Sequence, residues 1–217
     1  MRGRCGRLTR CSLEWKSEMT DQLHSPRVVI QAGPNGAGKS TTAQRIVRDV
    51  FGVRHYVNAD TLARGLSAFA YDEVAVSAGR IVLQWMRELA ADRKTFGFET
   101  TLAARSYASW IESLKADGYE CHLVFVSLRD PELAISRVAD RVRRGGHHIP
   151  DETVRRRFAA GLKNLFSLYI PLATSWMVLD NSSKRLPARL VALGGEGRGT
   201  YIERQNVWDR LVKEFDS

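Results

Sequence analysis

The sequence predicts an α/β fold in which helices flank a parallel β-sheet on both faces. Segments with the composition of short buried strands alternate with segments of helical periodicity, which is the order of elements that produces such a sheet. The first predicted strand, residues 27–32, leads directly into a glycine-rich loop and a helix predicted at 42–51. Without repeats or a second pattern, residues 19–217 are expected to form a single domain.

Two further strand–helix units are predicted in the first half of the chain. A short strand at 54–58 precedes a long helix at 72–92, and a strand at 95–98 precedes a helix at 106–116. The long helix carries apolar residues at helical spacing, which are expected to be its buried stripe: Val74, Ala78, Ile81, Trp85 and Leu89.

The second half begins with the most apolar strand, predicted at 120–128. Asp130 is expected to cap the next helix, with Pro131 at its first position, and Gly145-Gly146 to end that helix near Arg144.

A further helix is expected to be capped by Asp151. Its buried face is predicted to consist of Val154, Phe158, Leu162, Leu165 and Tyr169. Strands at 176–179 and 190–193, a glycine-rich turn at 194–199 and a helix at 206–215 complete the prediction.

The glycine-rich loop fits the phosphate-binding pattern G-x-x-x-x-G-K-[ST]. Its residues are Gly33, Pro34, Asn35, Gly36, Ala37, Gly38, Lys39, Ser40 and Thr41. Glycines allow backbone N–H groups to surround a triphosphate at the positive end of a helix. Lys39 is expected to contact the β- and γ-phosphates, and the Ser40 hydroxyl to ligate Mg²⁺. The sequence therefore predicts a binding site for ATP and Mg²⁺.

Polar residues follow several predicted strands, where ligands bind in open parallel sheets. Asp60 is expected either to accept a proton from a substrate hydroxyl or to cap a helix. Glu99, Thr100 and Thr101 are expected to hydrogen-bond a polar substrate or to hold a Mg²⁺-bound water. The alternative is that the Glu99 carboxylate accepts hydrogen bonds from loop N–H groups. Asp180 superficially resembles the aspartate that ends a Walker B strand, but a structural capping role is the simpler interpretation.

An arginine-bearing lid is predicted from Arg137, Arg141 and Arg144, which share one helix face at spacing i, i+4 and i+7. Because the helix ends at two glycines, this segment is expected to close over phosphates and neutralise charge in the transition state. The alternative is a solvated basic face. Arg155, Arg156 and Arg157 are consecutive, so at most two of them can face a site, and His147 and His148 are expected to be loop residues.

Composition narrows the class of protein. The chain has 44% hydrophobic and 26% charged residues, as is typical of globular proteins, and no apolar run long enough for a membrane span. Its cysteines number 3 and lack C-x-x-C spacing, which favours a reducing, cytoplasmic setting over disulfides or zinc. The net charge of +9 is compatible with nucleic acid, although arginines that serve phosphorylated small molecules explain it more simply.

Residues 1–18 differ from the rest of the chain. They contain four arginines and two of the cysteines, show neither strand nor helix periodicity, and lack the apolar stretch of a secretory signal. A disordered basic tail is expected here; the alternative is that translation starts at Met19.

Taken together, residues 32–42, Asn58-Ala59-Asp60, Phe98-Glu99-Thr100-Thr101 and the stretch from Gly145 to Pro150 resemble the zeta-toxin family, in particular its short chromosomal branch. The resemblance covers about residues 27–182. It implies a kinase that transfers the ATP γ-phosphate to the 3′-hydroxyl of UDP-N-acetylglucosamine. A further alternative is a catalytically weak switch that is regulated by an antitoxin-like helical protein partner, which covers the nucleotide site.

The resemblance also implies roles for residues. Asp60 would be the base, Glu99 and Thr101 would contact the sugar nucleotide, and a lid arginine, Arg141 first, would stabilise the transferring phosphoryl group. The second catalytic arginine of well-known members has no secure counterpart, because His147-His148 stands in that region; Arg144 or one of residues 155–157 is the expected substitute. Alternatives are a kinase of another metabolite and a nucleotide-dependent nucleic-acid-binding protein or polynucleotide kinase.

Overall fold

The computed structural model describes residues 25–66 and 71–215. The predicted basic tail and the alternative start at Met19 lie outside the described residues. Seven strands form one sheet in the order β2-β3-β1-β4-β5-β6-β7. The parallel part consists of β1 (Arg27–Ala32), β2 (His55–Val57), β3 (Phe96–Thr100), β4 (Glu120–Ser127) and β5 (Ser175–Asp180). Two antiparallel strands, β6 (Arg189–Gly195) and β7 (Arg198–Ile202), extend it.

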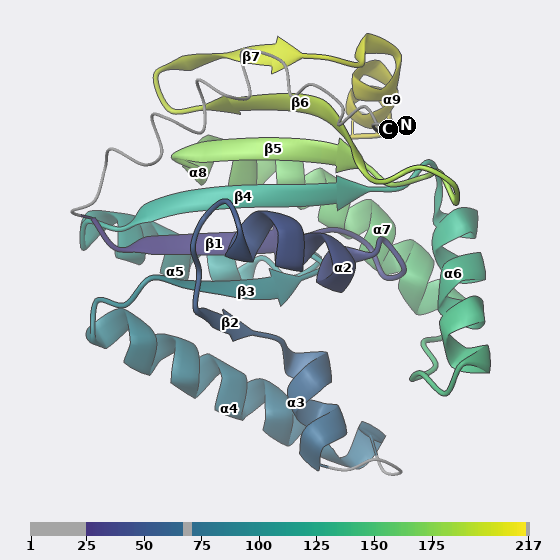
Figure 1. Cartoon of the computed structure of the whole chain (residues 1–217), viewed down its shortest axis with the longest axis horizontal. Coiled ribbons are helices and arrows are strands. Elements are labelled where there is room, and N and C mark those ends of the chain that lie inside the picture. The colour runs from purple at the N-terminus through teal and green to yellow at the C-terminus, as the bar shows by residue number, and fades with distance from the viewer. Residues whose placement is uncertain (1–24, 67–70, 216–217) are drawn as a thin grey trace, which may run out of the picture.

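Helices cover both faces of the sheet, as predicted (Figure 1). On β1, Val28 and Ile30 belong to one apolar cluster and Val29 to the other, so successive residues of a buried strand serve opposite faces. One face is covered by α4 (Tyr71–Ala91), α5 (Ser106–Ala116) and α9 (Gln205–Phe215). The other is covered by α2 (Lys39–Ala43), the π-helical segment η1 (Gln44–Arg48) and α6 (Pro131–Arg143). Helix α7 (Asp151–Asn164) continues through η2 (Leu165–Tyr169) and α8 (Ile170–Leu172).

Several predictions from local sequence patterns are confirmed by the structure. The helix α5 has the predicted bounds, and the Asp130 side chain caps α6 by accepting a hydrogen bond from the Leu133 N–H at 2.7 Å. All five residues of the predicted apolar face of the helix at 151–169 are buried.

Other predicted elements require correction. The helix predicted at 42–51 begins at Lys39, inside the phosphate-binding motif, and its later turn is widened, since the Phe51 N–H donates to the Ile46 carbonyl. Asp151 is the first residue of α7, and Pro150 occupies the capping position. The glycine-rich turn at 194–199 is shorter than predicted, because β7 begins at Arg198.

The buried stripe predicted for the long helix is also wrong in part. Ala78 and Leu89 are buried as expected, whereas Ile81 and Trp85 are 46% and 43% exposed. Val82 and Met86 take their place, so the buried stripe runs through Ala78, Val82, Met86 and Leu89. A second helix, α3 (Ala59–Leu66), was not predicted; it connects β2 to the region of α4 and carries Asp60 in its first turn.

Candidate active site

The phosphate-binding loop lies at the carboxyl end of β1, between β3 and β4 and against α6 (Figure 1). Gly36 has a φ of +76°, and a Cβ there would lie 2.8 Å from the Ala134 carbonyl oxygen and 3.1 Å from the Arg137 Cβ. Glycine is therefore required both by the backbone conformation and by the close approach of α6. The same packing places the first arginine of the predicted lid against the loop.

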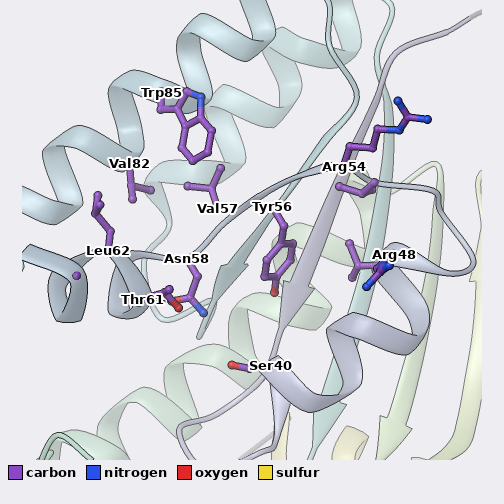
Figure 2. Close-up of a pocket in the computed structure, with 13 residues that line it drawn as sticks. Ser40, Arg48, Arg54, Tyr56, Val57, Asn58, Thr61, Leu62, Val82 and Trp85 are labelled. Atoms are coloured by element: carbon purple, nitrogen blue, oxygen red, sulfur yellow. Dashed lines mark hydrogen bonds between the residues drawn. The ribbon is translucent and has the colours of Figure 1, made fainter.

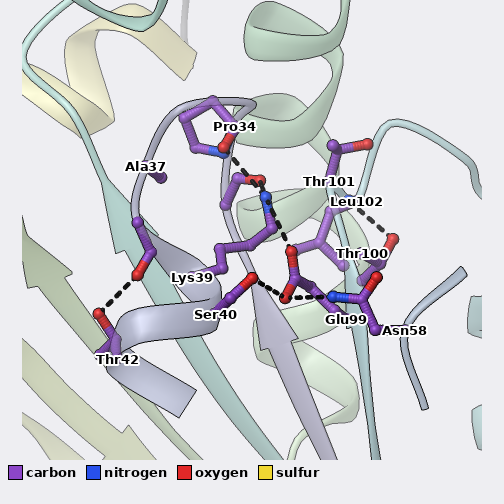
Figure 3. A network of polar contacts seen from close by, with 12 residues as sticks. Pro34, Ala37, Lys39, Ser40, Thr42, Asn58, Glu99, Thr100, Thr101 and Leu102 are labelled. Atoms are coloured by element: carbon purple, nitrogen blue, oxygen red, sulfur yellow. Dashed lines mark hydrogen bonds and ion pairs between the residues drawn. The ribbon is translucent and has the colours of Figure 1, made fainter. Parts of the chain in front are cut away.

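Lys39 is the centre of a buried polar network (Figure 3). Its ammonium group donates to the carbonyl oxygens of Gly33 at 2.9 Å and Pro34 at 3.1 Å, and lies 3.7 Å from Glu99 Oε1. Burial lowers the pKa of Lys39 and outweighs the opposite effects of Glu99 and Asp60. The loop thus holds a desolvated cation next to its own backbone carbonyl oxygens.

Glu99 is the hub of the hydrogen bonds around Lys39 (Figure 3). Its Oε2 accepts hydrogen bonds from Ser40 at 3.0 Å, Asn58 at 2.9 Å and Tyr56 at 3.4 Å. Burial, followed by the Glu99 charge, raises the pKa of Tyr56, so its hydroxyl remains a donor. Because these donors come from α2, from β2 and from the residue that follows β2, Glu99 fixes the positions of the phosphate loop and β2 relative to β3.

Asp60 does not cap α3. Asn58 does so, since its side-chain oxygen accepts a hydrogen bond from the Thr61 N–H at 3.1 Å. The capping alternative for Asp60 is therefore wrong. Asp60 stands in the first turn of α3, near enough to Lys39 to affect its pKa. A carboxylate in this place can accept a proton from a hydroxyl group that approaches the phosphates.

Thr100 and Thr101 shape the loop after β3. Their hydroxyl oxygens accept hydrogen bonds from the N–H groups of Leu102 at 3.1 Å and Ala103 at 3.5 Å, which were not predicted from the sequence. Leu102 is fully buried at a φ of +58°, a conformation that a non-glycine residue adopts at a cost. The α7 residue Asn164 holds this loop through a 2.7 Å hydrogen bond to the Leu102 carbonyl.

The lid arginines line a cavity of about 360 Å³, which we call the arginine basin. Its lining residues are Arg64, Arg137, Asp140, Arg141, Arg144, Gly145 and Gly146. Arg141 donates to the His147 carbonyl at 3.0 Å, while its Nε is buried without a hydrogen-bond partner. Arg137 donates to the Ser183 carbonyl at 3.3 Å, and burial lowers its pKa. The structure thus brings all three predicted lid arginines together and adds Arg64 from α3.

Of the consecutive arginines at 155–157, Arg155 is turned to a different partner. Its guanidinium forms two hydrogen bonds to Glu132, at 3.0 and 3.1 Å, on the exposed surface. The basin contains none of these three arginines.

The segment after β5 supports the phosphate loop from the other side. Asp180 accepts hydrogen bonds from Ser182 and pairs with Arg204 at 2.6 Å; although burial opposes them, these contacts hold its pKa below the usual range. Asp180 is therefore structural, as expected. Asn181 donates to the Ala37 carbonyl at 2.8 Å and thereby holds the phosphate loop in place.

A second cavity, of about 610 Å³, adjoins Ser40 and is called here the Trp85 cavity (Figure 2). One side is apolar, with Val57, Leu62, Val82 and Trp85, and the side near η1 carries Arg48 and Arg54. Ser40, Tyr56 and Asn58 are the polar residues that connect it to Glu99. Its size and its mixed lining are those of a small-molecule site.

A model of the zeta toxin family matches residues 12–170, most of the chain. The chain belongs to the zeta toxin family. It is 25% identical over 132 residues to an uncharacterized protein of Haemophilus influenzae, an alignment that covers 61% of this chain and 92% of that protein. The resemblance predicted from the motifs is thereby confirmed at the level of the family.

Two solved structures have a similar fold. The AvrRxo1-ORF1:-ORF2 complex with ATP has a TM-score of 0.72 at 14% identity, covering 90% of this chain; the match spans 66% of that chain. The toxin–antitoxin system PezAT of Streptococcus pneumoniae has a TM-score of 0.59 at 17% identity and covers 97% and 99% of the two chains. Family and fold support assignment of the chain as an ATP-dependent kinase of the P-loop type.

No site role was assigned from the sequence to Asn58, Arg64 or Asn181, although Asn58 is part of the motif at 58–60. Asn58 and Asn181 each follow a strand, which is a usable signal. Arg64 could be recognised only once α3 was known, since its place depends on the helix that carries it. Within residues 25–66 and 71–215, no helix is both long and apolar enough to span a membrane.

Proposed function

We propose that this chain transfers the γ-phosphate of ATP to a hydroxyl group of UDP-N-acetylglucosamine or a related sugar nucleotide. The observation that carries the acceptor assignment is the Trp85 cavity, which joins the phosphate loop at Ser40. Its apolar and aromatic side suits a nucleobase and a sugar face, and Arg48 and Arg54 suit a diphosphate. The resemblance of the chain's motifs to those of zeta toxins is the reason for naming this acceptor class.

In the proposed reaction, Lys39 leaves its loop carbonyls to contact the β- and γ-phosphates. Asp60 accepts the proton of the acceptor hydroxyl as its oxygen forms the new bond to the γ-phosphorus. The bond between that phosphorus and the bridging oxygen breaks, and its electron pair remains on ADP. Arg141 and its neighbours in the arginine basin neutralise the charge of the transferring group.

The residues present fit a magnesium ion. The Ser40 hydroxyl and the Glu99 carboxylate, 3.0 Å apart, are oxygen donors of the kind that Mg²⁺ prefers. The described residues contain no group of three or more His, Cys, Asp or Glu side chains suited to a metal. A pair of protein oxygens such as those of Ser40 and Glu99 is typical of Mg²⁺ that is bound by one or two protein groups together with substrate phosphates. When bound, the ion would supply charge neutralisation at the phosphates.

The decisive experiment is mass spectrometry of UDP-N-acetylglucosamine incubated with ATP, Mg²⁺ and the protein, with Lys39→Ala as the control. A product heavier by one phosphate, formed only by the wild type, is expected. Parallel reactions with other hydroxyl metabolites and with 5′-hydroxyl RNA test the alternatives. Phosphorylation of any of these in place of the sugar nucleotide would refute the acceptor assignment.

We also infer a neutralising protein partner, since the PezAT system pairs a toxin with an antitoxin. Such a partner is expected to co-purify with the wild type and to be released by ATP if it covers the phosphate site. Release by buffer alone at the same rate would contradict that location.

A further inference from the structure

Helix α3 presents two different faces to the two cavities. Thr61, Leu62 and Gly65 line the Trp85 cavity, whereas Arg64 lines the arginine basin. Asp60 and Arg64 are four residues apart, so their side chains lie on one face of the helix, one turn from each other. The proposed base and a guanidinium therefore point to the same side of α3.

The arginine basin has a large excess of positive charge. Four guanidiniums line it, those of Arg64, Arg137, Arg141 and Arg144, together with a single carboxylate, Asp140. That carboxylate is paired with Arg143, which lies outside the lining. Three of the arginines belong to α6 and its end, but Arg64 comes from α3, across the cavity. A polyanion is the ligand that such a basin would take, because like charges this close destabilise the site without one.

We propose that Arg64 is a catalytic arginine that binds the transferring phosphoryl group from the acceptor side, opposite Arg141. The proposal rests on the proposed function only in that phosphoryl transfer occurs; it does not depend on the identity of the acceptor. As the acceptor oxygen bonds to the γ-phosphorus, its proton passes to Asp60 and the bond to ADP breaks. Arg64, one turn along α3, then donates to the equatorial oxygens of the phosphoryl group.

This placement supplies the second arginine that the sequence did not place. It also explains why the base and this arginine share a helix face: any movement that brings Asp60 to the acceptor hydroxyl brings Arg64 to the phosphoryl group. The planar guanidinium can contact two phosphoryl oxygens at once, which a lysine ammonium cannot do in the same geometry.

The test needs no acceptor. Affinities for ADP and for ADP with aluminium fluoride, which mimics the transferring phosphoryl group, are measured by titration calorimetry with Mg²⁺ present. The wild type is expected to bind the aluminium fluoride complex more tightly than ADP. Arg64→Ala should keep its ADP affinity but lose about 100-fold or more of this enhancement, the range of a lost transition-state donor. Arg64→Lys should lose part of it.

The matched control is Arg87→Ala, which removes an exposed arginine of α4 outside both cavities. Thermal unfolding of each variant establishes that it is folded. An undiminished enhancement in Arg64→Ala would overturn the proposal, as would a wild type with no enhancement. A failure to phosphorylate UDP-N-acetylglucosamine, with the enhancement lost in Arg64→Ala, would instead refute only the acceptor.

Discussion

Two adjacent glycines follow α6, and a side chain is disfavoured at each of them for a different reason. We therefore expect substitutions at the two positions to have different effects. Gly145 has a φ of +82°, and a Cβ at this position would meet nothing within 4 Å, so its constraint is the backbone conformation alone. At Gly146 a Cβ would lie 2.6 Å from Arg141 Cγ and 2.9 Å from the Arg141 carbonyl oxygen. Its constraint is therefore space for Arg141.

Alanine at each position should accordingly affect different quantities. Gly145→Ala is expected to cost about 1–2 kcal/mol of stability, the cost of a left-handed conformation, with kcat unchanged. In Gly146→Ala, carbon atoms require about 3.5 Å, so Arg141 must move by about 0.9 Å. A displacement of about 1 Å in a catalytic group costs about 100-fold in rate. We expect that loss in kcat.

The assay is single-turnover phosphoryl transfer, combined with thermal unfolding of both variants. The opposite hypothesis is that the two glycines form a flexible hinge for the lid, in which case both variants should lose kcat to a similar extent. Equal losses would refute the reasoning from packing. An unchanged kcat in Gly146→Ala would show that the position of Arg141 does not limit the reaction.

Three other predictions follow from single contacts. Asn181→Asp removes the donor to the Ala37 carbonyl. It should weaken ATP binding about fivefold or more, because one hydrogen bond contributes about 1 kcal/mol. Unchanged affinity would exclude a role of Asn181 in holding the loop. Burial lowers the pKa of Lys39, so Lys39 should lose its charge at a pH below 10.5, its ordinary pKa, and ATP affinity should fall as the pH rises through that range. Titrations over the alkaline range that show constant affinity would contradict this. Burial raises the pKa of Cys121 to about 12, so in a variant with Cys5 and Cys11 replaced by serine a thiol reagent near neutral pH should react only after unfolding; rapid reaction of the folded protein would be the contrary result.

The phosphate loop, the cap of α6 and the apolar face of α7 could be predicted because each depends on residues close together in sequence. Asp130 caps the helix that starts at the next residue, and a motif of nine residues carries the glycines together with Lys39 and Ser40. These signals do not require knowledge of the tertiary structure.

The orientation of α4 could not be predicted in the same way. Its sequence has apolar residues on more than one side, and the helical spacing of these residues predicts that Trp85 lies in the core. In the structure Val82 and Met86 pack in the core, while Trp85 lines a cavity. A large aromatic side chain lining a cavity carries the same sequence signal as one in the core, so periodicity alone cannot separate them.

Helix α3 contributes different residues to the two cavities, and this explains why the candidate site could be predicted only in part. The helix separates the Trp85 cavity from the arginine basin, with Thr61, Leu62 and Gly65 facing one and Arg64 facing the other. Asp60 lines neither cavity, but it lies in the first turn of the same helix and near enough to Lys39 to affect its pKa. In the proposed reaction, a hydroxyl group on a ligand in the Trp85 cavity approaches the phosphates held by Lys39 on the side where Asp60 lies. Under the proposed function, this arrangement couples binding of the acceptor to deprotonation of its hydroxyl group. It depends on a short helix, and the residues that each of its faces contacts are known only once the surrounding elements are assembled.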